Sequence, residues 1–250
     1  MTMRRPPLGL DGDGAAPGGA PPASPVMVHA AARQVRFRII ASAAAAPGRL
    51  SAGARIAVAV AALGLLSVLV LPLWRIDLEA PQYPEGLGME IRVNTIVGVK
   101  PNDLNSINNL NHYIGMKVIR PEDFPELRFM PLLVAGLSAM GLVVAATGRR
   151  RLLYVWVALL VLSAVAGLAD FYRWAYDYGH NLDYERAIIK VPGMSYQPPL
   201  IGSKQLLNFR AHSWPGSGGW IAIAAGALAS LVAARELVRA RRARGVVGAA

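Results

Sequence analysis

Apolar and polar positions are arranged along this chain in long blocks. Four apolar blocks cover residues 55–75, 129–147, 152–171 and 219–238, and no charged residue lies near the middle of any block. Each block is close to the ~20 residues that an α-helix needs to cross a hydrocarbon core about 30 Å thick. The pattern predicts an all-α integral membrane protein with four transmembrane helices that contact the lipid bilayer.

Two long polar segments, residues 76–128 and 172–218, and one short turn, residues 148–151, separate these blocks. In the first segment, alternation of apolar and polar residues over 89–94 predicts a short strand or hairpin, and apolar residues at helical spacing over 103–117 predict a helix. The second segment is rich in prolines and aromatic residues, which favours a fixed conformation. The two segments are therefore expected to form a cap on the helical bundle.

Positive charge is concentrated on one side of this arrangement. Fifteen arginines and three acidic residues lie in or beside the tail 1–48, the turn 148–151 and the tail 239–250, a net charge of +12. The remaining charged residues sum to −1, which gives the total of +11. Short arginine-rich segments stay in the cytoplasm. We therefore predict a bacterial inner-membrane protein with N-in/C-in topology, a cytoplasmic turn and an extracytoplasmic cap.

The N-terminal region has few large apolar residues. Residues 1–48 are rich in Pro, Gly and Ala, which is typical of a disordered tail, and Met27 is an alternative start to Met1. The first apolar block is interpreted as a retained anchor, because residues 78–80 form a poor signal-peptidase site. The chain contains no cysteine, so disulfides and thiolate metal sites are excluded.

Small residues mark expected contact faces between helices. Ala222, Gly226 and Ser230 recur at four-residue spacing in the fourth block. The second block offers Ala135 and Ala139, with Gly136 and Gly141 nearby. Residues of this size let helix backbones approach closely. These positions are interpreted as structural packing faces of a four-helix bundle.

Candidate metal-binding side chains gather in the cap. They are His112, His180, His212, Met89, Met116 and Met194. Imidazole and thioether groups without thiolate suit copper, especially Cu(I) in an oxidising compartment. A helix over 103–117 would place His112 and Met116 one turn apart, with Asn108 able to orient the imidazole. The open alternative is that the methionines fill gaps in the cap and that His112 hydrogen-bonds a loop carbonyl.

Other function classes have weaker support. The sequence has no nucleophile elbow, no Gly-rich phosphate loop and no haem attachment motif, so no enzymatic activity is predicted. The apolar blocks lack the buried charges and broken helices typical of transporters. The arginines flank membrane spans, so their charge does not indicate nucleic-acid binding.

Four sequence stretches within the cap region carry a family resemblance. They are residues 80–86, 107–116, 192–202 and 204–209. Together they resemble a family of small multi-pass bacterial membrane proteins associated with nitrous oxide reductase and copper-chaperone gene clusters. The resemblance covers roughly residues 65–225 and implies an accessory role in copper delivery or reductase assembly. It also implies a copper-chaperone lipoprotein or a copper enzyme as partner.

These observations lead to a specific hypothesis for the cap. His112 and Met116 from the first polar segment are expected to meet Met194 or His180 from the second and to form an outward-facing Cu(I) site. The protein would then assist copper delivery to, or assembly of, an envelope copper enzyme such as nitrous oxide reductase. Two alternatives remain open, a structural docking subunit without metal and a transporter component.

Overall fold

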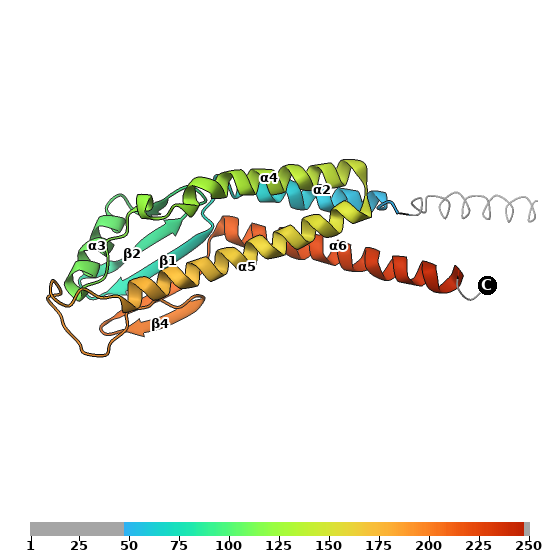
Figure 1. Cartoon of the computed structure of the whole chain (residues 1–250). Helices are drawn as coiled ribbons and strands as arrows, with labels where there is room; N and C mark the ends of the chain where they lie inside the picture. The colour runs from blue at the N-terminus through green and yellow to red at the C-terminus, as the bar shows by residue number, and fades with distance from the viewer. Residues whose placement is uncertain (1–47, 248–250) are drawn as a thin grey trace, which may run out of the picture. The chain divides into compact units, whose positions relative to one another are not determined.

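The computed structural model describes residues 48–247 (Figure 1). In chain order these residues form α2 (Ala52–Ser67), β1 (Trp74–Ala80), β2 (Tyr83–Ile91), β3 (Ile96–Gly98), α3 (Asp103–Ile114), the 3-10 turn η1 (Pro121–Asp123), α4 (Glu126–Thr147), α5 (Arg150–His180), β4 (Gly202–Leu206), β5 (Phe209–Pro215) and α6 (Ser217–Val247). The disorder predicted for residues 1–48 lies outside the described residues, apart from Gly48. The predicted tail at 239–250 continues α6 as far as the structure describes it.

The all-α prediction is wrong, because the two polar segments build a five-stranded antiparallel sheet. Its strand order is β3-β2-β1-β5-β4, so the second polar segment adds two strands beside the first strand of the first. In β1, the apolar residues Ile76 and Leu78 alternate with the charged residues Arg75, Asp77 and Glu79. This two-residue period suits a strand with one buried face and one solvated face.

The prediction of four membrane-spanning helices is also wrong. Three described helices are long and apolar enough to span a membrane, namely α4, α5 and the part of α6 from Ser217 to Arg242. α2 has only 16 residues and is therefore about 24 Å long, less than the ~30 Å of a hydrocarbon core. The apolar sequence continues beyond it, but Val68–Leu71 form turns and Pro72 precedes the start of β1. The last residues of the predicted first span therefore belong to β1 instead of to a helix.

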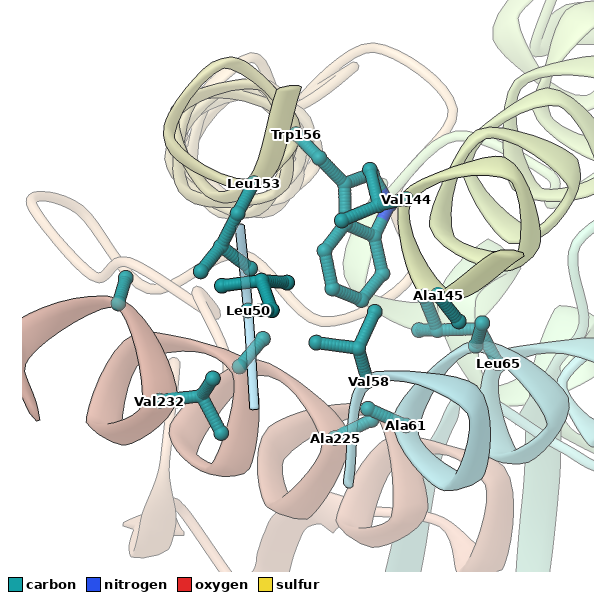
Figure 2. Packing of buried hydrophobic residues seen from close by; sticks show 13 residues of the cluster. Leu50, Val58, Ala61, Leu65, Val144, Ala145, Leu153, Trp156, Ala225 and Val232 are labelled. Carbon is teal, nitrogen blue, oxygen red and sulfur yellow. The ribbon is translucent and has the colours of Figure 1, made fainter. Parts of the chain in front are cut away.

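The helical bundle has a core in which α2 packs against α4 and α6. Figure 2 shows the ring of Trp156, from α5, inserted between Val144 of α4 and Val58 of α2. Trp156 is fully buried, and its indole Nε1 donates a 2.8 Å hydrogen bond to the Leu137 carbonyl. Gly141 leaves room for this ring, which bears out its assignment to a packing face.

The packing face of α6 differs from the prediction by about one position. Ala225 and Ala229 are buried in the bundle core, whereas a Cβ atom at Gly226 would have no neighbour within 4 Å. Every third or fourth residue lies on one face of a helix, so two adjacent small-residue stripes were possible. The side chains beside both stripes are apolar, because an apolar helix of this kind has apolar surroundings on every side. The sequence therefore does not show which stripe is the packing face.

At the arginine-rich end of the bundle, the start of α2 is hydrogen-bonded to the end of α4 and to the turn that follows it. The Leu50 amide donates a 2.7 Å hydrogen bond to the Gly148 carbonyl, so the residues before α2 lie beside the turn between α4 and α5. The Arg55 guanidinium donates 2.7 Å bonds to the Ala145 and Ala146 carbonyls at the end of α4. These carbonyls lack partners within the helix, so Arg55 acts as a C-terminal cap.

The sheet has a second hydrophobic core on its inner face. Ile76 and Met89 are directly paired across β1 and β2, and both are buried against Ile107 of α3. Phe124 and Tyr178, from the segment before α4 and from the end of α5, complete this core. The last turns of α5 therefore lie beside the sheet, as Figure 1 shows.

Candidate functional site

The end of α3 positions the first two predicted copper ligands. The helix ends at Ile114, earlier than predicted, because Gly115 adopts a left-handed conformation with φ of 77°. The Met116 amide donates to the Asn111 carbonyl at 2.9 Å, and the Gly115 amide donates to the His112 carbonyl at 3.3 Å. These two bonds form a Schellman motif. Met116 therefore lies beyond the helix, and the predicted one-turn spacing on a helix face does not hold.

His112 and Met116 nevertheless share one cavity of about 760 Å³. Its aromatic floor is formed by Phe124, Trp174 and Tyr178. The Trp174 and Tyr178 rings lie 4.9 Å apart, and Phe124 meets Trp174 edge-on at 5.3 Å. His112 is exposed and Met116 is half-buried, so the imidazole lies at the solvent side of the cavity and the thioether lies deeper.

The rim of this cavity carries charges of both signs. Its basic side chains are Lys117, Arg120, Arg173 and Arg186, and its acidic side chains are Asp123, Glu126, Asp177 and Asp183. Several of them are already paired within the protein. The Lys117 ammonium lies 2.6 Å from Asp177, and the Arg186 guanidinium lies 3.5 Å from Asp183. Among the described residues, Arg120 has no carboxylate within ion-pair distance.

The other two predicted ligands lie outside the lining of this cavity. His180, the last residue of α5, is exposed and stacks on Tyr176 with ring centroids 4.0 Å apart. Its Nδ1 atom lies 3.0 Å from the Tyr176 carbonyl oxygen. Met194 is half-buried in a turn in which its amide donates to the Val191 carbonyl at 3.2 Å. Two of the four predicted donors therefore line the same cavity.

Asn108 binds the backbone of Ile119, in place of the predicted contact with His112. Its side-chain Nδ2 donates a 3.1 Å hydrogen bond to the Ile119 carbonyl, and its Oδ1 accepts a 2.8 Å bond from the Ile119 backbone amide. This pair of bonds fixes the segment that follows Met116. Asp103, the first residue of α3, accepts hydrogen bonds from the Gly88 and Lys100 amides and is buried.

A second cavity, of about 690 Å³, lies where the two hairpin ends of the sheet meet the start of α3. Residues 80, 81 and 83–86 line it together with Gln205 and Asn208, so two of the four resemblance stretches converge there. The Lys100 ammonium donates to the Glu85 and Gly86 carbonyls at 3.0 and 2.9 Å and fixes the first hairpin. These contacts hold the first hairpin against the segment that precedes α3.

Polar side chains on the outer sheet face form a cluster that no local sequence pattern predicts. Ser203 Oγ lies 2.6 Å from His212 Nδ1, and His212 Nε2 lies 3.4 Å from Glu79. Beside them, hydrogen bonds to Asp77 raise the pKa of Arg75. β4 and β5 form a hairpin that is distant in sequence from β1, so the pairing of β1 with β5 brings Glu79 beside His212.

The resemblance stretch at 192–202 packs against the end of α5. The Tyr196 amide donates a 3.0 Å hydrogen bond to the Gly179 carbonyl, and a Cβ atom at Gly179 would overlap the Gln197 backbone. Tyr196 is buried, and this burial raises the pKa of its phenol. The stretch is therefore fixed by backbone contacts with α5.

The donor set at His112 and Met116 fits a soft monovalent copper ion better than a hard cation. Among residues 48–242, no three His, Asp or Glu side chains converge in a metal-binding arrangement. A metal bound in the cavity of His112 and Met116 would therefore use one imidazole, one thioether and a further donor. No protein-family model matches this chain, and no curated protein is significantly similar to it.

Proposed function

We propose that this protein is an accessory protein of the bacterial inner membrane that assists copper delivery to, or assembly of, an envelope copper enzyme such as nitrous oxide reductase. The observation that carries the proposal is that His112 and Met116 line one cavity in the cap. The family resemblance of residues 107–116, which include both side chains, points to the same role. The helical bundle would serve as the anchor that holds this cavity at the outer membrane surface.

The chemistry of the two donors suits transfer of copper rather than permanent storage. Cu(I) accepts imidazole and thioether ligands and tolerates low coordination numbers. Two protein donors leave positions open for ligands from a partner protein. His112 lies at the exposed side of the cavity, where such a partner would have access to the metal.

The test is the Cu(I) affinity of the detergent-purified chain, measured by competition with a colorimetric chelator. We expect the double substitution His112→Ala/Met116→Ala to weaken binding by more than about tenfold, because it removes both donors. A His180→Ala/Met194→Ala variant is the matched control, and we expect it to retain the affinity of the wild type. Equal affinities for the wild type and the first variant would contradict the proposed copper site.

A specific surface favours the docking alternative. Tyr113, Tyr184, Ile188 and Ile189 are exposed side chains of the cap, and Ile188 retains 65% of its surface. The Ile188 and Ile189 amides both donate to the Tyr113 carbonyl, so these residues form one patch. Exposed apolar patches often mark protein contacts. If copper binding fails, this patch supports a docking subunit.

The proposed orientation has its own test. The basic ends of α4, α5 and α6 should lie in the cytoplasm and the sheet outside, because the arginines gather at one end of the bundle. Reporter fusions after Arg151 and Ala250 should give a cytoplasmic signal, and fusions after Lys100 and Lys204 should give an outside signal. An inside signal at Lys100 would contradict the N-in/C-in topology.

A further inference from the structure

The cavity that contains His112 and Met116 extends to the level at which two apolar helices end. Glu126, the first residue of α4, and Pro125 line it on one side. Arg173 and Trp174 of α5 line it on the other, just after the apolar block that ends at residue 171. Aromatic and charged residues at the ends of spanning helices lie at the headgroup level of a bilayer. This part of the cavity would therefore be open to lipid headgroups.

The side chains at this level suit a ligand that carries one negative and one positive group. Arg120 is exposed, lines the cavity and has no carboxylate partner among the described residues, so its guanidinium is available for a phosphate. Trp174 is half-buried and lines the cavity, and an indole ring attracts ammonium groups. Glu126 adds a negative charge beside Trp174. Acidic and basic residues of the lining are equal in number, which disfavours a purely anionic ligand.

Apolar surface continues from this cavity along both helices. On α4, Phe129 and Leu132 retain 67% and 74% of their surface, and they follow Glu126 by one and two turns. On α5, Val165 and Leu168 are exposed on the membrane side of Trp174. A ligand whose polar group lies in the cavity and whose chains lie on these faces would satisfy both surfaces. This arrangement distinguishes a lipid from a free phosphate ester.

We propose that the membrane-level half of this cavity binds the headgroup of a zwitterionic phospholipid of the phosphatidylethanolamine class. Arg120 holds the phosphate, and the ammonium lies against Trp174 near Glu126. The acyl chains follow α4 and α5. This site uses other side chains than the proposed copper site, so each proposal can fail without the other.

The test uses the delipidated full-length chain in detergent, with bound lipid counted by native mass spectrometry and affinity obtained by titration. The probes are short-chain phosphatidylethanolamine, short-chain phosphatidylglycerol and soluble glycerophosphoethanolamine. We expect phosphatidylethanolamine to bind most tightly, because phosphatidylglycerol lacks the ammonium and the soluble ester lacks the acyl chains. Equal binding of phosphatidylglycerol, or equal binding of the soluble ester, would overturn the proposal.

Matched variants locate the site. Arg120→Gln should weaken phosphatidylethanolamine binding by roughly threefold to tenfold, whereas Arg128→Gln should leave it unchanged, because Arg128 is exposed but does not line the cavity. Trp174→Leu should weaken binding by a similar factor, and Trp174→Phe should retain most of it. Equal effects of the two arginine variants would overturn the proposal even if the tryptophan variants fold poorly.

Discussion

Replacement of Gly141 by leucine is expected to destabilise the bundle by about 3 kcal/mol. A Cβ atom at this position would lie 2.5 Å from Cζ2 of Trp156 and 2.7 Å from Cβ of Ala62. These neighbours belong to α5 and α2, so the substitution would force two helices away from α4. The Trp156 ring cannot turn aside without loss of its hydrogen bond to the Leu137 carbonyl. Thermal unfolding in detergent, followed by circular dichroism, measures the effect.

Gly136 on the same helix provides the matched control. A Cβ atom there has no neighbour within 4 Å, and the residue is exposed. Gly136→Leu adds the same side chain and removes the same helix-weakening glycine, so it should be neutral or slightly stabilising. Equal losses for the two variants would mean that Gly141 does not lie at a tight helix contact.

The long helices could be predicted from composition alone, but their ends could not. The block at 152–171 lies inside α5, which begins at Arg150 and continues to His180. The extra residues are rich in aromatic and charged side chains, so they do not register as a membrane span. They are helical because Trp174 and Tyr178 pack on the sheet core, a contact that depends on distant residues. Tertiary packing thus extends the helix beyond its apolar part.

The sheet was difficult to predict because its pairing is non-local. Ile76 pairs with Met89 on one side and with Ser213 on the other, and Ser213 comes from the second polar segment. Only one short alternating run, 89–94, was recognised, and it overlaps the end of β2. β1 begins at Trp74, within a block whose composition favoured a helix. Strand formation there depends on partners on both sides, which no local pattern reveals.

The nearness of two of the four proposed ligands could be predicted from the sequence. His112 and Met116 are close in sequence, so the chain keeps them together even though Gly115 ends the helix between them. His180 and Met194 come from a segment whose path is set by long-range contacts. The stacking of His180 on Tyr176 is local but was not anticipated, because the predicted helix ended at residue 171. The side chains that line the cavity near the ends of α4 and α5 could not be predicted from the sequence, because only the packing of these two helices brings them together.

The substitution Glu236→Ala is expected to destabilise the chain by about 3 kcal/mol. Glu236 retains only 1% of its surface, and its two carboxylate oxygens lie 2.8 Å from Arg150 and 3.0 Å from Arg239. Arg150 begins α5, so the ion pair joins this helix to α6. Without Glu236, the largely buried Arg150 guanidinium would have no compensating charge, whereas the exposed Arg239 would turn to water. Thermal unfolding in detergent measures the loss.

Two further variants separate the ion pair from a general effect of charge. Glu185 is exposed and has no ion pair among the described residues, so Glu185→Ala should change stability by less than about 0.5 kcal/mol. The double substitution Arg150→Met/Glu236→Leu removes both buried charges and should recover most of the stability that Glu236→Ala loses. If the double variant were as unstable as Glu236→Ala, side-chain packing of Glu236 rather than its charge would hold α5 against α6.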